Sequence, residues 1–251
     1  MITDILYHFY LGLINSLRID SFLYIIITDD KIINILWKII KFNLVINLFL
    51  SYFISLIFPP FCLIINFVSI FFHTIHYFDV INNIPVKTKN NNQIFDTMAV
   101  ILTITIYQIS ISLMLTILNY IFYEMKLILG IINYIIPTIY HSFYFYNNVW
   151  QRYNINIQKR IDTYETFWPY YFGYGTLISL LYYNYSIPYI AFLYNMYMFV
   201  LTIIPFSYPI KKQNIIPIPE NNTSYFKIDM SIFSYISKLL FRLISLKFRP
   251  I

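Results

Sequence analysis

The sequence is poor in the residues that many soluble domains and enzymes require. Charged residues make up 11% of the 251 positions, whereas soluble domains carry roughly 25%. Only 4 glycines are present, and they form no Gly-rich phosphate loop. The single cysteine, Cys62, excludes an intrachain disulfide and a cysteine-based metal site. A Gly-x-Ser-x-Gly elbow and a cysteine–histidine dyad are also absent, so we expect no enzyme and no cofactor.

Hydrophobic residues, in contrast, make up 59% of the chain. They gather in runs of the length that a membrane helix needs, about 20 residues. The net charge of +6 suggests nucleic acid at first sight. A nucleic-acid reader, however, clusters its basic residues on one soluble face, and here they flank the apolar runs. We therefore expect the lipid bilayer as the main partner and no nucleic acid.

The apolar runs predict one all-α integral membrane domain over residues 1–251, a multipass bundle of about six membrane-embedded helices. Three hairpins occupy residues 42–205. Residues 1–30 repeat apolar and polar positions with a helical period, which is typical of an amphipathic helix in the membrane interface. Residues 206–251 form a tail that contains a basic amphipathic helix at 225–248.

Turn-forming and charged residues mark the three hairpins. Pro59 and Pro60 cannot donate backbone hydrogen bonds, so they end a helix and turn the first hairpin. Glu124 and Lys126 interrupt a long apolar stretch and mark the turn of the second. The third hairpin turns at 184–188. The predicted helices are 42–58 and 61–77, two within 95–145, and 167–182 and 187–205.

The layout has a strong charge asymmetry, because it places every lysine and arginine except Lys126 on one side of the membrane. Basic loops stay on the cytoplasmic face, so both termini and the tail at 206–251 are predicted to be cytoplasmic. The sequons at Asn221 and Asn222 then lie on the wrong side for glycosylation, and the one at Asn184 lies too near the bilayer, so we expect no glycan. The basic cytoplasmic elements are suited to anionic lipids and to cytoplasmic protein partners.

Two pairs of ionisable residues each have two interpretations. Inside the bilayer, where a charge costs about 2.5–3.5 kcal/mol, Glu124 and Lys126 would indicate proton or ion conduction. At a hairpin turn in water they need no such role, which is the simpler interpretation. His73 and His76 would place two imidazoles on one helix face for a metal or haem, but a third ligand at suitable spacing is absent. Interfacial histidines explain that pair, so we predict no metal site.

The most unusual segment is residues 150–175, whose second half is predicted to begin a helix. Pro169 suits the first turn, where its missing donor costs nothing, and Thr166 is a candidate cap before it. Trp168, Tyr170 and Tyr171 are predicted to belong to an aromatic belt at the membrane interface.

Small and charged residues complete this segment. Gly173 and Gly175 leave room for a neighbouring helix, and they also offer a contact for a second copy of the chain. Arg152 or Arg160 is predicted to pair with an acidic residue at positions 162–165 and to hold the loop beneath the bundle. The sequence leaves the oligomeric state open.

Three stretches here resemble the signature of the etoposide-induced 2.4 family. They are the tripeptide Trp-Gln-Arg at 150–152, the stretch Gln-Lys-Arg-Ile at 158–161 and the octapeptide Trp-Pro-Tyr-Tyr-Phe-Gly-Tyr-Gly at 168–175. The resemblance implies structural or partner-binding roles for Trp150, Arg152, Arg160, Trp168, Pro169, Tyr170, Tyr171, Phe172, Gly173 and Gly175.

The resemblance implies a multipass protein of the endoplasmic reticulum membrane. In animal relatives the family acts in autophagy, when autophagosomes mature into degradative compartments. The wider superfamily includes bacterial sulfate permeases of the CysZ type, which implies an anion permease or channel as the alternative. The chain is rich in Ile, Asn, Tyr, Phe and Lys, a composition that AT-rich coding sequences produce. Together with Glu124, this composition suggests a third possibility, an organelle-encoded subunit of a membrane respiratory complex. Animal members carry a long basic N-terminal region that looks replaced here by residues 1–30.

Overall fold

The computed structural model describes five continuous ranges of the chain and four further residues. They are 1–28, 30–46, 114–153, 155–184 and 188–207, together with Phe72, Ile75, His76 and Asp79. Within these ranges the chain is helical or in turns and contains no strand, so the predicted all-α class is confirmed there. Of the predicted hairpin at 42–58 and 61–77, only residues 42–46, Phe72, Ile75 and His76 are described, and Cys62 and the tail from residue 208 lie outside the described residues.

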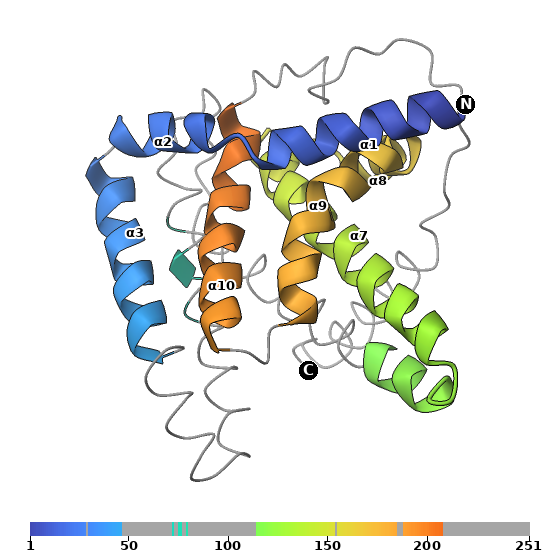
Figure 1. Ribbon diagram of the computed structural model, residues 1–251. Helices are drawn as coiled ribbons and strands as arrows, with labels where there is room; N and C mark the ends of the chain where they lie inside the picture. Colours follow the sequence, from blue (N-terminus) through green and yellow to red (C-terminus); the bar gives the residue numbers. More distant parts are fainter. Residues whose placement is uncertain are drawn as a thin grey trace, which may run out of the picture.

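The N-terminal segment forms two helices rather than the single interfacial helix predicted for 1–30. Helix α1 (Ile2–Ser16) ends where the amide of Leu17 donates to the carbonyl of Ile14, and α2 (Ile19–Ile27) begins two residues later. The two helices are nearly in line, whereas α3 (Asp30–Asn43) turns away from them. Helices α1 and α2 run crosswise to the later helices α9 and α10 (Figure 1).

The second half of the described chain begins with a turn. Residues 114–121 are helical, and the chain reverses at 122–124, where the sequence predicts the turn of the second hairpin. The helices that follow are α7 (Lys126–Arg152), α8 (Ile157–Thr166), α9 (Trp168–Tyr183) and α10 (Pro188–Ile203), with the short 3-10 helix η2 (Ile204–Ser207). Helices α9 and α10 lie close to the two ranges predicted as helices there, 167–182 and 187–205.

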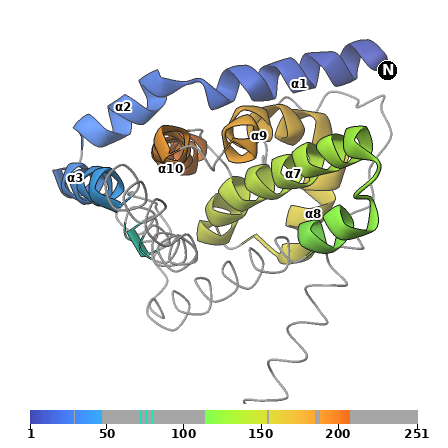
Figure 2. The same cartoon turned by 60° about the horizontal axis from the view of Figure 1, so that its bottom comes forward.

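Helix α9 lies at the centre of the packing. It contacts α1, α7 and α10, while α2 and α3 pack against α10. Figure 2 shows α9 and α10 nearly end-on. One flank of this pair is lined by α1 and α2, and another is lined by α7. Residues of α2, α3, α7, α9 and α10 form one main hydrophobic core, and Leu11 of α1 packs against it.

Three helical stretches among the described residues are long and apolar enough to cross a membrane. They are Ile2–Ile27, which joins α1 and α2, then Lys126–Trp150 and Tyr189–Ser207. Helix α9 has 16 residues and is therefore about 24 Å long, shorter than the hydrocarbon core of about 30 Å. The chain is thus all-helical in its described part and has the composition of a membrane protein.

Candidate functional site

Aromatic residues of the signature join Tyr146 and Tyr164 in a buried cluster between α7, α8 and α9. Its rings have less than 2% of their surface exposed. We call these residues the aromatic cluster: Tyr146, Trp150, Tyr164, Tyr170, Tyr171 and Tyr174.

The rings of the aromatic cluster meet in the geometries that aromatic pairs prefer. Tyr146 lies edge-on to Tyr171 at 4.9 Å and to Tyr174 at 5.1 Å between ring centroids. Trp150 meets Tyr171 edge-on at 5.7 Å, and Tyr164 stacks on Tyr171 at 4.7 Å. Such pairs contribute about 0.5–1.5 kcal/mol each beyond the area that they bury. Tyr171 is therefore the ring on which α7, α8 and α9 converge.

The cluster's hydroxyl groups join helices that are distant in sequence. The hydroxyls of Tyr146 and Tyr170 lie 2.6 Å apart, and Asn15 Nδ2 donates to the Tyr170 hydroxyl at 3.1 Å. The hydroxyl of Tyr174 donates to the carbonyl of Leu201 at 3.0 Å. Buried polar atoms need such partners, and these bonds tie α9 to α7, α1 and α10.

The predicted aromatic belt is wrong for Tyr170 and Tyr171. Both side chains are fully buried inside the protein, and only Trp168 keeps some exposed surface. The reason is the central position of α9, whose first turns are covered by α1 and α7. Pro169 lies in the first turn as predicted, but Thr166 does not cap α9, because its hydroxyl donates to the carbonyl of Asp162.

Glycines allow the backbones of three helices to touch. A Cβ atom added at Gly173 would overlap the carbonyl oxygen of Phe9, and one at Gly175 would overlap that of Thr138. The predicted close approach of a neighbouring helix is confirmed, and the neighbours are α1 and α7 of the same chain. The suggested contact of these glycines with a second copy is therefore wrong, because both positions are already covered. Gly12 of α1, which the sequence did not single out, is equally tight against Tyr170.

Arg160 stabilises the connection between α7 and α8. Its Nε donates to the carbonyl of Ile155 at 2.6 Å, and its Nη1 donates to Asn147 Oδ1 at 2.9 Å. Burial lowers the pKa of this guanidinium below its usual value. Arg160 therefore does not pair with Asp162 or Glu165 as predicted. It donates instead to a side-chain amide and to a backbone carbonyl. The side chain of Arg152, the last residue of α7, lies outside the described atoms.

The comparisons with known proteins find a viral relative. No family model and no solved structure matches the chain. An uncharacterized protein of Acanthamoeba polyphaga mimivirus is 32% identical over 245 residues, which cover 91% of this chain and 93% of the viral protein. The chain belongs to the same family as this viral protein. The name of the relative assigns no activity.

Sequence reasoning missed a polar junction around His141. This buried side chain lies between α7, α9 and α10, with Nε2 at 2.8 Å from the Tyr194 hydroxyl and Nδ1 at 3.3 Å from Ser179 Oγ. Its partners lie 38 and 53 residues further along the chain, so no local motif marks them. His76 contacts the carbonyl of Phe72 at 2.9 Å, and His73 lies outside the described residues.

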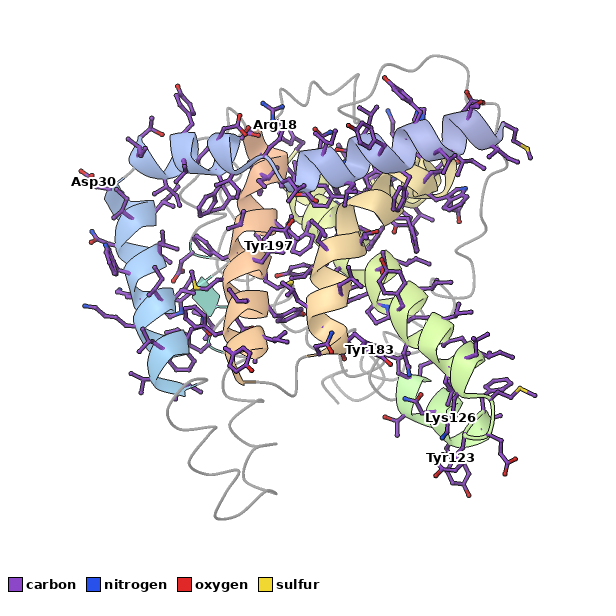
Figure 3. The ribbon with its side chains drawn as sticks, viewed as in Figure 1. Arg18, Asp30, Tyr123, Lys126, Tyr183 and Tyr197 are labelled. Carbon is purple, nitrogen blue, oxygen red and sulfur yellow. The ribbon has the colours of Figure 1, made fainter. Side chains whose placement is uncertain are left out.

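The ionisable residues of the second hairpin lie at its tip. Glu124 and Lys126 are exposed, the first in the turn and the second at the start of α7. Lys126 and Tyr123 lie toward the opposite end of the molecule from Arg18 and Asp30 (Figure 3). Across the part of the chain that the structure covers, no three His, Cys, Asp or Glu residues gather in a group able to hold a metal ion.

Proposed function

We propose that the chain is a non-enzymatic, multipass protein of the endoplasmic reticulum membrane that acts in autophagosome maturation, as the etoposide-induced 2.4 family does in animals. The observation that carries the proposal is the use of the signature: its tyrosines and glycines hold α1, α7, α9 and α10 together. A signature spent on helix packing is what a membrane scaffold requires, since small residues and interhelical hydrogen bonds hold such helices together.

The outward side chains of α7 support the membrane setting. Leu127, Ile131 and Ile135 repeat at helical spacing and are exposed, Leu127 by 78%. On the inward side the same helix carries Ser142, whose Oγ lies 2.7 Å from the Tyr164 hydroxyl. Apolar residues outside and hydrogen-bonded polar residues inside suit a helix that is surrounded by lipid.

The finer layout is part of the same proposal. We infer six membrane-embedded helices in three hairpins, with both termini in the cytoplasm. The antiparallel pair of α9 and α10 supports one hairpin, and the turn at 122–124 supports another. Helix α7 is long enough to cross fully, and so is α10 when η2 is added to it, whereas the 16 residues of α9 cross only part of the bilayer.

The contacts of Arg160 favour this proposal over an anion permease. A permease would need the signature's basic residues to face an anion at the mouth of a pathway. Two of the donor groups of Arg160 are already used by Ile155 and Asn147 of the same chain. The basic surface of α3, with Lys31, Lys38 and Lys41 exposed, is better placed for anionic lipid or a cytoplasmic partner.

The test is to localise a C-terminally tagged copy in the native cell and to score autophagosome clearance during starvation after depletion. We expect a reticular pattern and stalled clearance, restored by the wild-type chain and by Gly130→Leu but not by Gly173→Leu. Gly130 is the matched control, because a Cβ there meets nothing within 4 Å. Normal clearance after depletion would refute the autophagy role, and another compartment would refute the location.

A further inference from the structure

The outer surface of α1 carries a row of exposed apolar side chains. Ile2, Leu6, Tyr10, Ile14 and Leu17 recur at intervals of three or four residues, and all are exposed, Leu6 by 60%. Residues at this spacing lie on one face of a helix. We call this face, with its continuation on α2, the outward stripe.

The outward stripe continues across the junction onto α2. Leu23, Tyr24 and Ile27 are exposed there, the last two by 72% each. Because α1 and α2 are nearly in line on the same flank of the bundle, their exposed faces together form one surface (Figure 2). Its tyrosines are a residue type that is enriched where protein meets the membrane–water interface.

The inner surface of α1 has the opposite character. The residues that it buries are His8, Gly12 and Ser16. Gly12 lies against the backbone of Tyr170, and the carbonyl of Ser16 accepts a hydrogen bond from Tyr197 at 2.9 Å. The buried residues of α1 are therefore small or polar, with Leu11 packing beside them against the core, whereas the most exposed residues are largely aliphatic or tyrosine.

The segment Ile2–Ile27 has the length of a membrane span, but two features oppose a crossing. It runs crosswise to α10, the candidate span beside it (Figure 1). Its junction also carries Arg18, which lies 3.5 Å from Asp20 in an exposed ion pair. In a crossing helix this pair would lie near the middle of the bilayer, where a charge costs about 2.5–3.5 kcal/mol.

We propose that α1 and α2 lie in the plane of the membrane, with the outward stripe against the lipid hydrocarbon at its boundary with the headgroups. The inference rests on the proposed membrane location but not on the autophagy role. Lipid, rather than water, is the occupant because the same chain puts Lys31, Lys38 and Lys41 on the outer face of α3. The absence of lysine from the outward stripe is therefore local and not a consequence of composition.

The test uses nitroxide labels on the full chain in vesicles of phosphatidylcholine and phosphatidylserine. Cys62→Ser provides the background, and single cysteines replace Leu6, Tyr10, Ile14 and Leu23 in turn. Collisions with oxygen, which concentrates in hydrocarbon, are compared with collisions with a water-soluble nickel chelate. Lys38→Cys on α3 is the aqueous reference, and Ile131→Cys on α7 is the lipid reference.

We expect all four stripe labels to favour oxygen, with nearly the same ratio of oxygen to nickel collisions. A ratio that changes steadily from position 6 to position 23 would mean a crossing helix, because those positions would differ in depth by about 26 Å. Few collisions with either reagent would mean a protein partner or a second copy. Either result overturns the inference.

The reference label separates this inference from the proposed membrane location. If the stripe labels favour nickel while the label at Ile131 favours oxygen, the outward stripe faces water and only the inference fails. If the label at Ile131 also favours nickel, the proposed membrane location fails as well.

Discussion

Helices α1 and α3 are both amphipathic, but they turn opposite faces outward. Helix α1 buries His8, Gly12 and Ser16 and exposes aliphatic and tyrosine side chains. Helix α3 buries Ile32 and Ile39 and exposes its lysines. A helical period therefore locates two faces without telling which of them meets the protein. The surroundings decide, and within this one chain they differ from flank to flank.

The largest expected effect comes from separating α1 from the bundle. Gly173→Leu forces a side chain into the space held by the carbonyl of Phe9. We expect the free energy of unfolding in detergent micelles to fall by about 3 kcal/mol or more, at the upper end of what overpacking costs. If proteolysis of α1 increases at the same time and that of α3 does not, then α1 and α3 are held to the bundle independently.

The control for this change is Gly130→Leu on α7. A Cβ at Gly130 meets nothing within 4 Å, and leucine forms helix better than glycine. The control should leave stability unchanged or raise it by up to about 1 kcal/mol. Equal losses from the two substitutions would contradict the glycine contact between α1 and α9.

The second prediction exchanges the outer residues of the two helices. In bilayers Leu6→Lys should destabilise the folded chain by about 2 kcal/mol, somewhat less than the cost of a lysine at the bilayer centre. Lys38→Leu should change stability by no more than about 0.5 kcal/mol, as is usual for an exposed position. Unfolding in bicelles measures both. A neutral Leu6→Lys would mean that α1 and α3 share the same aqueous surroundings.

Much of the helical layout follows from the sequence, because its causes are local. The apolar run and Pro188 place α10, and Glu124 marks a turn, since a charge in mid-run costs more in lipid than in water. The break between α1 and α2 at Leu17 and Arg18 contains neither glycine nor proline, and no local signal predicted it.

The interior of the candidate site depends on partners that are distant in sequence. Tyr170 has the composition of an interfacial belt residue, and only its contacts with Asn15 and Tyr146 identify it as core. His141 is a lone histidine in the sequence until α9 and α10 bring Ser179 and Tyr194 to it. The chemistry of these residues was visible, but tertiary packing decided their roles.

The third prediction tests the hydrogen bonds that hold α1 but not α3. Tyr170→Phe removes the hydroxyl that lies between Asn15 and Tyr146. We expect a loss of about 1 kcal/mol, the usual net value of a hydrogen bond, and faster amide exchange in α1 than in α3. Tyr183→Phe is the control, because the Tyr183 side chain is exposed. Equal amide exchange in α1 and α3 would contradict the proposal that the Tyr170 hydroxyl holds α1 to the bundle.

The smallest expected effect concerns the outer face of α3. Lys41 lies in the last turn, where a positive charge interacts favourably with the helix dipole. If α3 faces water, Lys41→Gln should cost about 0.3 kcal/mol at low ionic strength and nothing in 1 M salt, where the Debye length is about 3 Å. Lys38→Gln, further from the helix end, should show neither the loss nor the salt dependence. If Lys41→Gln stabilises the chain in bilayers instead, α3 faces lipid, and the contrast between its surroundings and those of α1 does not hold.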